Sequence, residues 1–182
     1  TYPSLSWGAY YSPDFGNNWL NVNSGPTFYQ FLVDGNIVYA ASEGSISVSS
    51  NNGVNWDFIS PGVNMVRTIC KKGNILFSGG YSGIYRTTNN GHIWIPSNNG
   101  LHDSTSLPVV NYLFADSLNI YAGLRFYGIY VSTDDGLSWT QRNNGLPYLS
   151  INTIYKSGNH IFAGSDSGGV YVSSNNGLNW TV

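Results

Sequence analysis

The stretch Ser132-Thr-Asp134-Asp-Gly136-Leu-Ser-Trp139 occurs five times in this chain in nearly the same form. Each copy, called a box below, follows the pattern Ser/Thr-x-Asp/Asn-x-Gly-x-x-Trp. The other copies are Ser12–Trp19, Ser49–Trp56, Thr87–Trp94 and Ser173–Trp180. Their tryptophans are separated by 37, 38, 45 and 41 positions. The chain is therefore an array of units of about 40 residues.

Each box has the composition of a tight hairpin turn. Its glycine adopts a positive φ without a Cβ penalty, and the Asp or Asn oxygen can accept N–H groups of the turn. The tryptophan can then cover the turn with a large ring. We therefore predict a structural role for two sets of residues, the Asp/Asn positions Asp14, Asn51, Asn89, Asp134 and Asn175 and the tryptophans Trp19, Trp56, Trp94, Trp139 and Trp180.

Three apolar runs precede the boxes. An alternating strand such as Gly128–Ser132 leads directly into the box, and shorter and longer runs such as Ile120–Gly123 and Val109–Phe114 come before it. Turns rich in Gly, Asn and Ser separate these runs, and no segment shows helical periodicity. Four short strands in each unit of about 40 residues are typical of a β-propeller blade.

The fold class that follows is an all-β propeller of four-stranded antiparallel blades. We expect residues 1–182 to form one propeller domain or part of one. The blade units are about 1–24 (partial), 25–61, 62–98, 99–143 and 144–182. The first unit supplies only the outer half of a blade, which leaves four complete blades. Because an unclosed propeller exposes apolar faces and strand edges, we expect further repeats or another copy to cover the open ends.

The boxes resemble the Asp-box, or BNR, repeats of sialidases, sortilin-type receptors, xyloglucanases and a photosystem II assembly factor. The longer unit, as in Gly169-Val-Tyr-Val-Ser-Ser-Asn-Asn-Gly177, is similar to secreted repeat proteins of the Bacteroidetes. This resemblance implies boxes between the third and fourth strands of a blade, away from the substrate face of the enzymes. It also implies a protein that is secreted or at the bacterial cell surface. Asp14 and Asp134 keep the Asp of the repeat, whereas Asn replaces it in the other three boxes.

The composition excludes several other classes of function. Charged residues make up only 9% of the chain and the net charge is −2, so a basic surface for nucleic acid is absent from the sequence. No apolar run reaches the length of a membrane span. Cys70 is the single cysteine, and His92, His102 and His160 lack the spacing of metal ligands. We therefore expect neither a metal nor a cofactor.

A carbohydrate-active enzyme, sialidase-like or xyloglucanase-like, is the alternative that the resemblance leaves open. Glycosidases of the common type need two carboxylates about 5–10 Å apart. The other aspartates belong to boxes or to turns between strands. The remaining candidates for catalytic carboxylates are Glu43, Asp57, Asp103 and Asp166. The arginines do not form a sialidase motif. We predict no catalytic residue, and a non-catalytic binding or structural module as the function.

The predicted ligand site is formed by the loops between the second and third strands, because their length and chemistry vary while the strands repeat. Tyr81, Arg125, Phe126 and Tyr127 supply the aromatic and guanidinium groups that are common in recognition sites. Glu43 and Asp166 are their expected polar neighbours. The ligand is a glycan or an extracellular protein. The competing interpretation is that these rings pack against the next blade.

Overall fold

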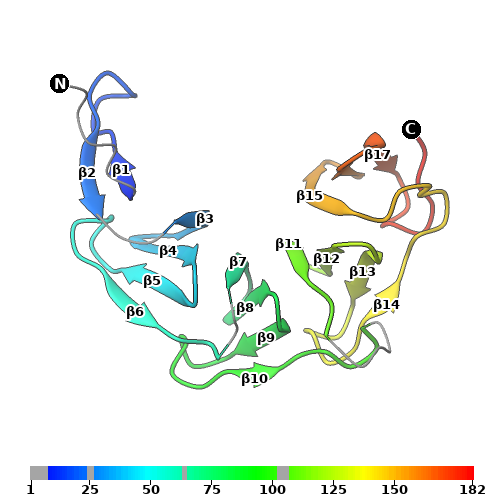
Figure 1. Ribbon diagram of the computed structural model, residues 1–182, viewed down its shortest axis with the longest axis horizontal. Helices are drawn as coiled ribbons and strands as arrows, with labels where there is room; N and C mark the ends of the chain where they lie inside the picture. Colours follow the sequence, from blue (N-terminus) through cyan, green and yellow to red (C-terminus); the bar gives the residue numbers. More distant parts are fainter. Residues whose placement is uncertain (1–7, 24–26, 63–64, 102–106) are drawn as a thin grey trace.

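The computed structural model describes residues 8–23, 27–62, 65–101 and 107–182, which form antiparallel sheets placed one after another along an arc (Figure 1). Three sheets have four strands each in chain order. They are β3 (Phe28–Asp34), β4 (Ile37–Ser42), β5 (Ser45–Ser49) and β6 (Asp57–Ile59); β7 (Val66–Lys72), β8 (Ile75–Gly80), β9 (Gly83–Thr87) and β10 (Ile95–Pro96); and β11 (Val110–Ala115), β12 (Ile120–Leu124), β13 (Gly128–Ser132) and β14 (Thr140–Gln141). The predicted fold class, an all-β propeller of four-stranded blades, is confirmed.

Smaller sheets lie at the two ends of the arc. The first consists of β1 (Ala9–Tyr11) and β2 (Leu20–Asn23), the two strands expected of an outer half blade. The last consists of β15 (Ile151–Ser157), β16 (His160–Ser165) and β17 (Gly169–Ser173), and a single bridge between Val172 and Thr181 stands where the other sheets have a fourth strand. The unit boundary expected after residue 24 lies outside the described ranges, and the one expected after residue 61 lies beside a segment outside them.

In the three four-stranded sheets the box is the turn between the third and fourth strands; the first box connects β1 and β2, and the last lies between β17 and the bridge at Thr181. In the box of β5 and β6, Asn52 and Gly53 have φ values of 57° and 87°, and the N–H of Val54 donates to the Asn51 carbonyl at 3.3 Å. Two successive residues with positive φ and this hydrogen bond define a type I′ hairpin turn. The same pair of φ signs and the same bond occur in all five boxes.

Side chains close each turn. Ser132 Oγ donates to Asp134 Oδ1 at 2.8 Å and accepts the Gly136 N–H at 2.8 Å, while Asp134 Oδ1 accepts the Ser138 N–H at 2.9 Å. Asn51, Asn89 and Asn175 make the equivalent bonds with their amide oxygens. In Asp134 the second carboxylate oxygen also accepts Ser138 Oγ, and these bonds lower its pKa to about 2. An Asn can therefore replace the Asp without loss of the turn's backbone bonds.

The boxes also join each blade to the one before it. A Cβ on Gly91 would lie 2.7 Å from Cδ1 of Ile59 in the preceding sheet, and one on Gly136 would lie 2.5 Å from Cε1 of Phe77. Trp139 Nε1 donates to the Ser97 carbonyl at 2.8 Å, across the same joint. Close backbone approach thus requires glycine here for a second reason besides its φ.

The tryptophans are not equally buried. Trp139 and Trp180 are each 3% exposed, whereas Trp19 is 62% exposed. The physical reason is that residues of the preceding blade bury the tryptophan ring of each box. No described strand precedes β1, so the Trp19 ring is left exposed. The Trp19 ring does lie over its own turn, 3.8 Å from where a Cβ on Gly16 would be.

The core fills the spaces between neighbouring sheets, in three clusters of buried apolar side chains. On the inner strands Ile69 and Leu113 are buried, but the equivalent Phe31 of β3 is 47% exposed, and Tyr155 at the other end of the arc is 64% exposed. The first and last of the four long inner strands, β3 and β15, therefore each expose one face to solvent. Among the described residues no helix is long and apolar enough to cross a membrane.

Trp139→Ala should lower the free energy of unfolding by about 3–5 kcal/mol, because a buried ring and its bond to the Ser97 carbonyl are lost. Trp19→Ala should change it by no more than about 0.5 kcal/mol, as expected for an exposed side chain. Urea unfolding followed by circular dichroism measures both. An equal decrease in the free energy of unfolding for the two variants would contradict the conclusion that the preceding blade buries the tryptophan ring.

Asp134→Ala should cost about 1–3 kcal/mol at neutral pH by leaving the turn's donors unpaired, and Asp134→Asn should retain most of that stability. The pKa of Asp134 falls from 3.8 to about 2 on folding, so its charge stabilises the fold at neutral pH. That contribution is lost as the pH drops through this range. The stability difference between wild type and Asp134→Asn should therefore shrink below about pH 4; a difference independent of pH would oppose this account.

Candidate functional site

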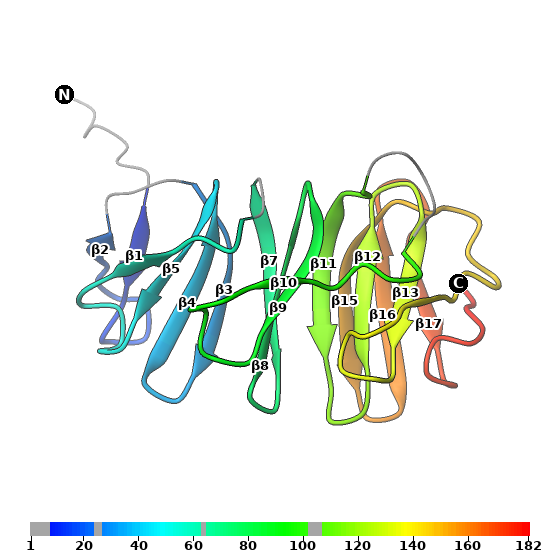
Figure 2. The same cartoon turned by 90° about the horizontal axis from the view of Figure 1, so that it is seen from below.

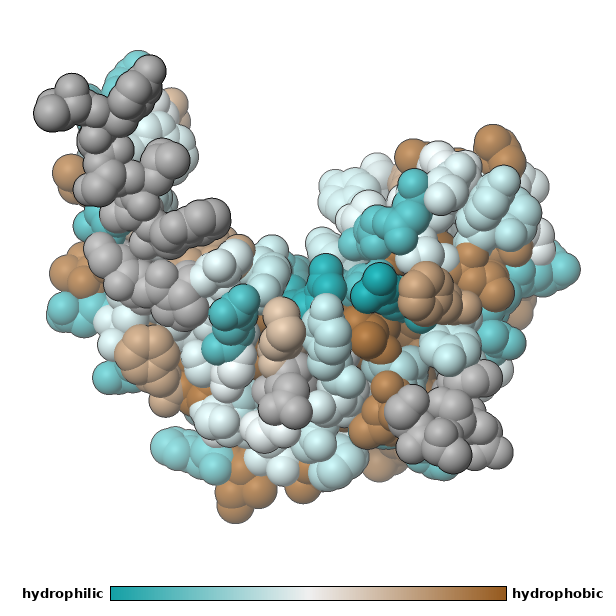
Figure 3. Space-filling model, in the orientation of Figure 1, coloured by the Kyte–Doolittle hydropathy of each residue, from teal (hydrophilic) through white to brown (hydrophobic). Residues whose placement is uncertain are grey.

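The four loops that connect second and third strands lie at one end of the sheets, the upper edge in Figure 2. Glu43 lies between β4 and β5, Tyr81 between β8 and β9, and Asp166 between β16 and β17. Arg125, Phe126 and Tyr127 connect β12 and β13. We call this end of the sheets the loop face; it is turned toward the viewer in Figure 3.

A β-bulge interrupts the innermost strand of each of the four larger sheets beside this face. The register shifts between Phe28 and Gln30, Val66 and Thr68, Val110 and Tyr112, and Ile151 and Thr153. The extra residues are Tyr29, Arg67, Asn111 and Asn152. Bulges redirect side chains and are common beside functional sites. Each blade thus adds one polar side chain that the sequence analysis did not select.

Arg67 connects the first half of the loop face. Its guanidinium lies 5.9 Å from the ring centroid of Tyr29 and 5.9 Å from that of Tyr81. The Tyr29 hydroxyl in turn donates to Glu43 Oε1 at 3.3 Å. Two predicted site residues, Tyr81 and Glu43, are therefore brought together through two bulge residues.

A hydrogen-bonded chain orders the second half. Asp166 accepts from Ser150 Oγ at 2.5 Å and from Asn152 Nδ2, and these bonds hold the pKa of Asp166 below its ordinary value. Asn111 Nδ2 donates to the Ile151 carbonyl at 3.0 Å and to Asn152 Oδ1 at 3.2 Å. Asp166 is consequently an ionised, fixed acceptor.

Two adjoining pockets share Asp166. A polar one of about 370 Å³ lies between the inner ends of β7, β11 and β15. Its lining consists of Arg67, Asn111, Arg125, Asn152 and Asp166. A second one of about 320 Å³ is lined by Phe126, Tyr148, Leu149, Ser150, Asp166 and Ser167. Strongly hydrophilic and hydrophobic residues accordingly lie next to each other on this face in Figure 3.

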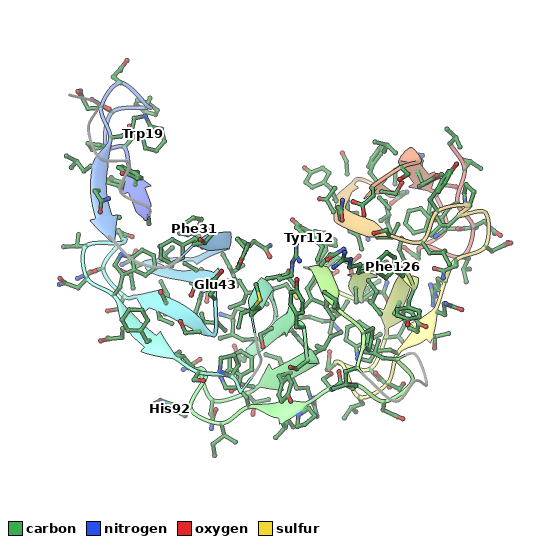
Figure 4. The ribbon with its side chains drawn as sticks, viewed as in Figure 1. Trp19, Phe31, Glu43, His92, Tyr112 and Phe126 are labelled. Carbon is green, nitrogen blue, oxygen red and sulfur yellow. The ribbon has the colours of Figure 1, made fainter. Side chains whose placement is uncertain are left out.

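The rings predicted to bind ligand separate into two groups. Phe126 and Tyr81 are 64% and 40% exposed, and Phe126 lies at the end of β12 in Figure 4, with the Arg125 guanidinium 4.9 Å from its centroid. Tyr127 instead packs, half-buried, against the core cluster between the sheets of β7 and β11. The Tyr127 ring thus contributes to blade packing, as the competing interpretation of these rings expects, and its part in ligand binding stays a prediction.

The backbone of Phe126 is strained. Seven described non-glycine residues have positive φ; five are box residues, and the remaining two are Met65 and Phe126, at φ 74°. A bulky residue rarely adopts this conformation, and such strain gathers at binding and catalytic sites. The exposed Phe126 ring is thus held at the cost of a strained backbone.

Reactive and metal-binding groups are sparse. Within the described residues, no three His, Cys, Asp or Glu side chains group closely enough to hold a metal ion. His92 and His160 are exposed, and His102 lies outside the described ranges. Cys70 is buried, which raises its pKa, so the group remains a thiol.

Solved structures share this architecture, although no family model and no curated protein sequence matches the chain. The GH74 xyloglucanase from Xanthomonas campestris aligns over 97% of this chain and 34% of its own, with TM-score 0.73 and 17% identity. The extracellular domain of BT4673 from B. thetaiotaomicron aligns over 86% and 22%, with TM-score 0.71 and 18% identity. YCF48 bound to D1 peptide aligns over 94% and 59%, with TM-score 0.64 and 14% identity.

These similarities define the class of the molecule. At such low identity they show the fold alone: the chain is a β-propeller module of the kind found in GH74 enzymes, YCF48 and BT4673. The chain spans about a third or less of two GH74 enzymes that it matches, 28% of one and 34% of the other.

Phe126→Gly should raise the free energy of unfolding by about 1 kcal/mol, because glycine adopts the left-handed backbone without strain. Phe58→Gly is the matched control, since Phe58 is 65% exposed in β6 and glycine weakens a strand by about 0.5–1 kcal/mol. Chemical denaturation of both variants gives the comparison. A loss at Phe126 as large as that at Phe58 would show that the loop is not strained.

Proposed function

We propose that this chain is a non-catalytic glycan-binding module, secreted or exposed at the bacterial cell surface, and that its loop face is the binding surface. The observation that carries the proposal is the exposed, strained Phe126 ring in a pocket with the fixed carboxylate of Asp166. A largely apolar wall with a few fixed polar groups is the usual composition of a small-ligand site.

The polar groups suit sugar hydroxyls. Asp166 accepts one hydrogen bond at each carboxylate oxygen from the protein, and each oxygen has capacity for another. Tyr148, which is 49% exposed, lines the same pocket as Phe126 and offers a second ring for a pyranose to stack on. Neutral and acidic sugars both fit this description.

The carboxylates favour binding over hydrolysis. A glycosidase acid must hold its proton near neutral pH, which requires a raised pKa, whereas the pKa of Asp166 is lowered. Glu43 belongs to the loop of β4 and β5 and accepts the Tyr29 hydroxyl, with the loop of Tyr81 between it and Arg125. Asp57 lies on β6, the outermost strand of its sheet, and Asp103 lies outside the described residues.

An extracellular site of action is the remaining part of the proposal. Its support is a surface with few charges, 9% of all residues, together with the resemblance of the boxes to those of secreted repeat proteins. One structural relative is itself the extracellular domain of its protein.

A glycan array probed with wild type, Phe126→Ala and Phe58→Ala tests the function. Loss of the Phe126 ring should weaken binding at least about tenfold, and loss of the equally exposed Phe58 ring on β6 should not weaken it. Bound glycans should be recovered without new reducing ends. Hydrolysis abolished by Glu43→Gln or Asp166→Asn would instead establish the enzyme alternative, and absence of binding to every glycan would overturn the proposal.

A further inference from the structure

Two of the seven Lys and Arg side chains of this protein differ from the other five in the contacts that their charged groups make. Lys71, Lys72 and Lys156 form ion pairs with Asp34, Asp135 and Asp116. The guanidinium of Arg86 donates to the Asp135 carbonyl at 3.1 Å, and that of Arg142 donates to the Asn176 carbonyl at 2.6 Å. Within the described residues, Arg67 and Arg125 contact aromatic rings but have neither a hydrogen bond nor an ion pair at the guanidinium.

These two guanidiniums line the same polar pocket. Arg67 reaches it from the bulge of β7 and Arg125 from the loop after β12, so two different blades converge on one space of about 370 Å³. The stabilising cations lie elsewhere: Lys72 and Arg86 contact the box of Asp135, and Arg142 contacts the box of Asn176. A role in holding blades together therefore does not account for Arg67 and Arg125.

The pocket keeps both arginines available. Asp166, its one carboxylate, accepts from Ser150 and Asn152; the charge of Arg125 helps to lower the pKa of Asp166, but within the described residues no ion pair joins it to either guanidinium. The rings of Tyr29 and Tyr81 flank Arg67, and Phe126 lies beside Arg125, which restricts the side chains without occupying their N–H donors. Donors that are already positioned lose less conformational entropy when a ligand binds.

We propose that Arg67 and Arg125 form a carboxylate-binding subsite and that the glycan bound by the loop face is acidic, carrying uronic acid residues. A guanidinium presents parallel N–H donors that match the two oxygens of a carboxylate. The neighbouring rings of Phe126 and Tyr148 accommodate the sugar that carries the acid. The inference rests on the proposed glycan-binding function and specifies its ligand class.

Because the overall charge of the protein is negative, the pocket should recognise only a few acidic groups of the ligand at a time. The chain has a net charge of −2, so a polyanion gains no general attraction and must be recognised locally. Two guanidiniums against one carboxylate leave the pocket with one excess positive charge. Affinity should therefore fall with added NaCl, but only moderately.

The test compares tetragalacturonate with its full methyl ester, which has the same backbone without the charges, by isothermal titration calorimetry. The acid should bind at least about tenfold more tightly than the ester. Arg67→Gln and Arg125→Gln should each remove about tenfold of the affinity for the acid and leave the ester unaffected. Arg86→Gln, at the box edge, is the matched control and should bind both as wild type does.

The outcomes separate this inference from the function on which it rests. Equal binding of acid and ester, unaffected by the arginine variants, would overturn the acidic subsite and leave glycan binding standing. Tight binding of an oligoglutamate peptide with none of tetragalacturonate would overturn the glycan as occupant. Arg67→Lys and Arg125→Lys keep the positive charge but lose the parallel N–H donors of the guanidinium, so they should bind tetragalacturonate with intermediate affinity. These variants provide the test if a Gln variant does not fold.

Discussion

Two blades of this protein are each joined to the one before by a box turn that has no room for a side chain. At Gly91 and Gly136 a Cβ would lie 2.7 and 2.5 Å from side chains of the preceding sheet. The type I′ turn needs the same glycine for its φ, so one residue meets a conformational and a packing requirement together. The Ser or Thr hydroxyl and the Asp or Asn oxygen then satisfy the turn's N–H groups. These two joints depend on that glycine, and Trp19, whose box has no described strand before β1, is exposed.

The outer and inner strands of the sheets differ in how much their residues vary between blades. Boxes at the outer strands are nearly uniform, and even the exchange of Asp for Asn keeps their backbone bonds. At the inner strands the bulge recurs in four sheets, but its residue is Tyr29, Arg67, Asn111 or Asn152. A constant scaffold thus presents one polar side chain from each of these four blades to the same face, of three different types. This arrangement suits a binding surface whose chemistry changes without a cost to the fold.

The sequence predicted the scaffold well because the boxes repeat five times, and a pattern that recurs at a fixed spacing defines both the turn and the strands around it. The residues of the loop face were predicted only in part. Phe126 and Asp166 lie beside one pocket as expected from their loops, but the bulge residues were missed, because an inserted residue breaks the two-residue period on which strand assignment relies. Their signal is a recurring position, as in Val66-Arg67-Thr68 and Ile151-Asn152-Thr153. The packing of Tyr127 depends on a neighbouring blade, and a loop sequence alone does not contain that information.

The central claim is that the loop face binds an acidic glycan through the guanidiniums of Arg67 and Arg125. The side-chain signals of the four arginines test it most directly. Selective ¹⁵N-arginine labelling would give four side-chain Nε–Hε resonances, from Arg67, Arg86, Arg125 and Arg142, which substitution to Gln assigns. On titration with tetragalacturonate the signals of Arg67 and Arg125 should move together and saturate, while those of Arg86 and Arg142, held by box carbonyls, should stay in place. Movement of Arg86 or Arg142 with no change at Arg67 and Arg125 would place the ligand on the box edge and contradict the account.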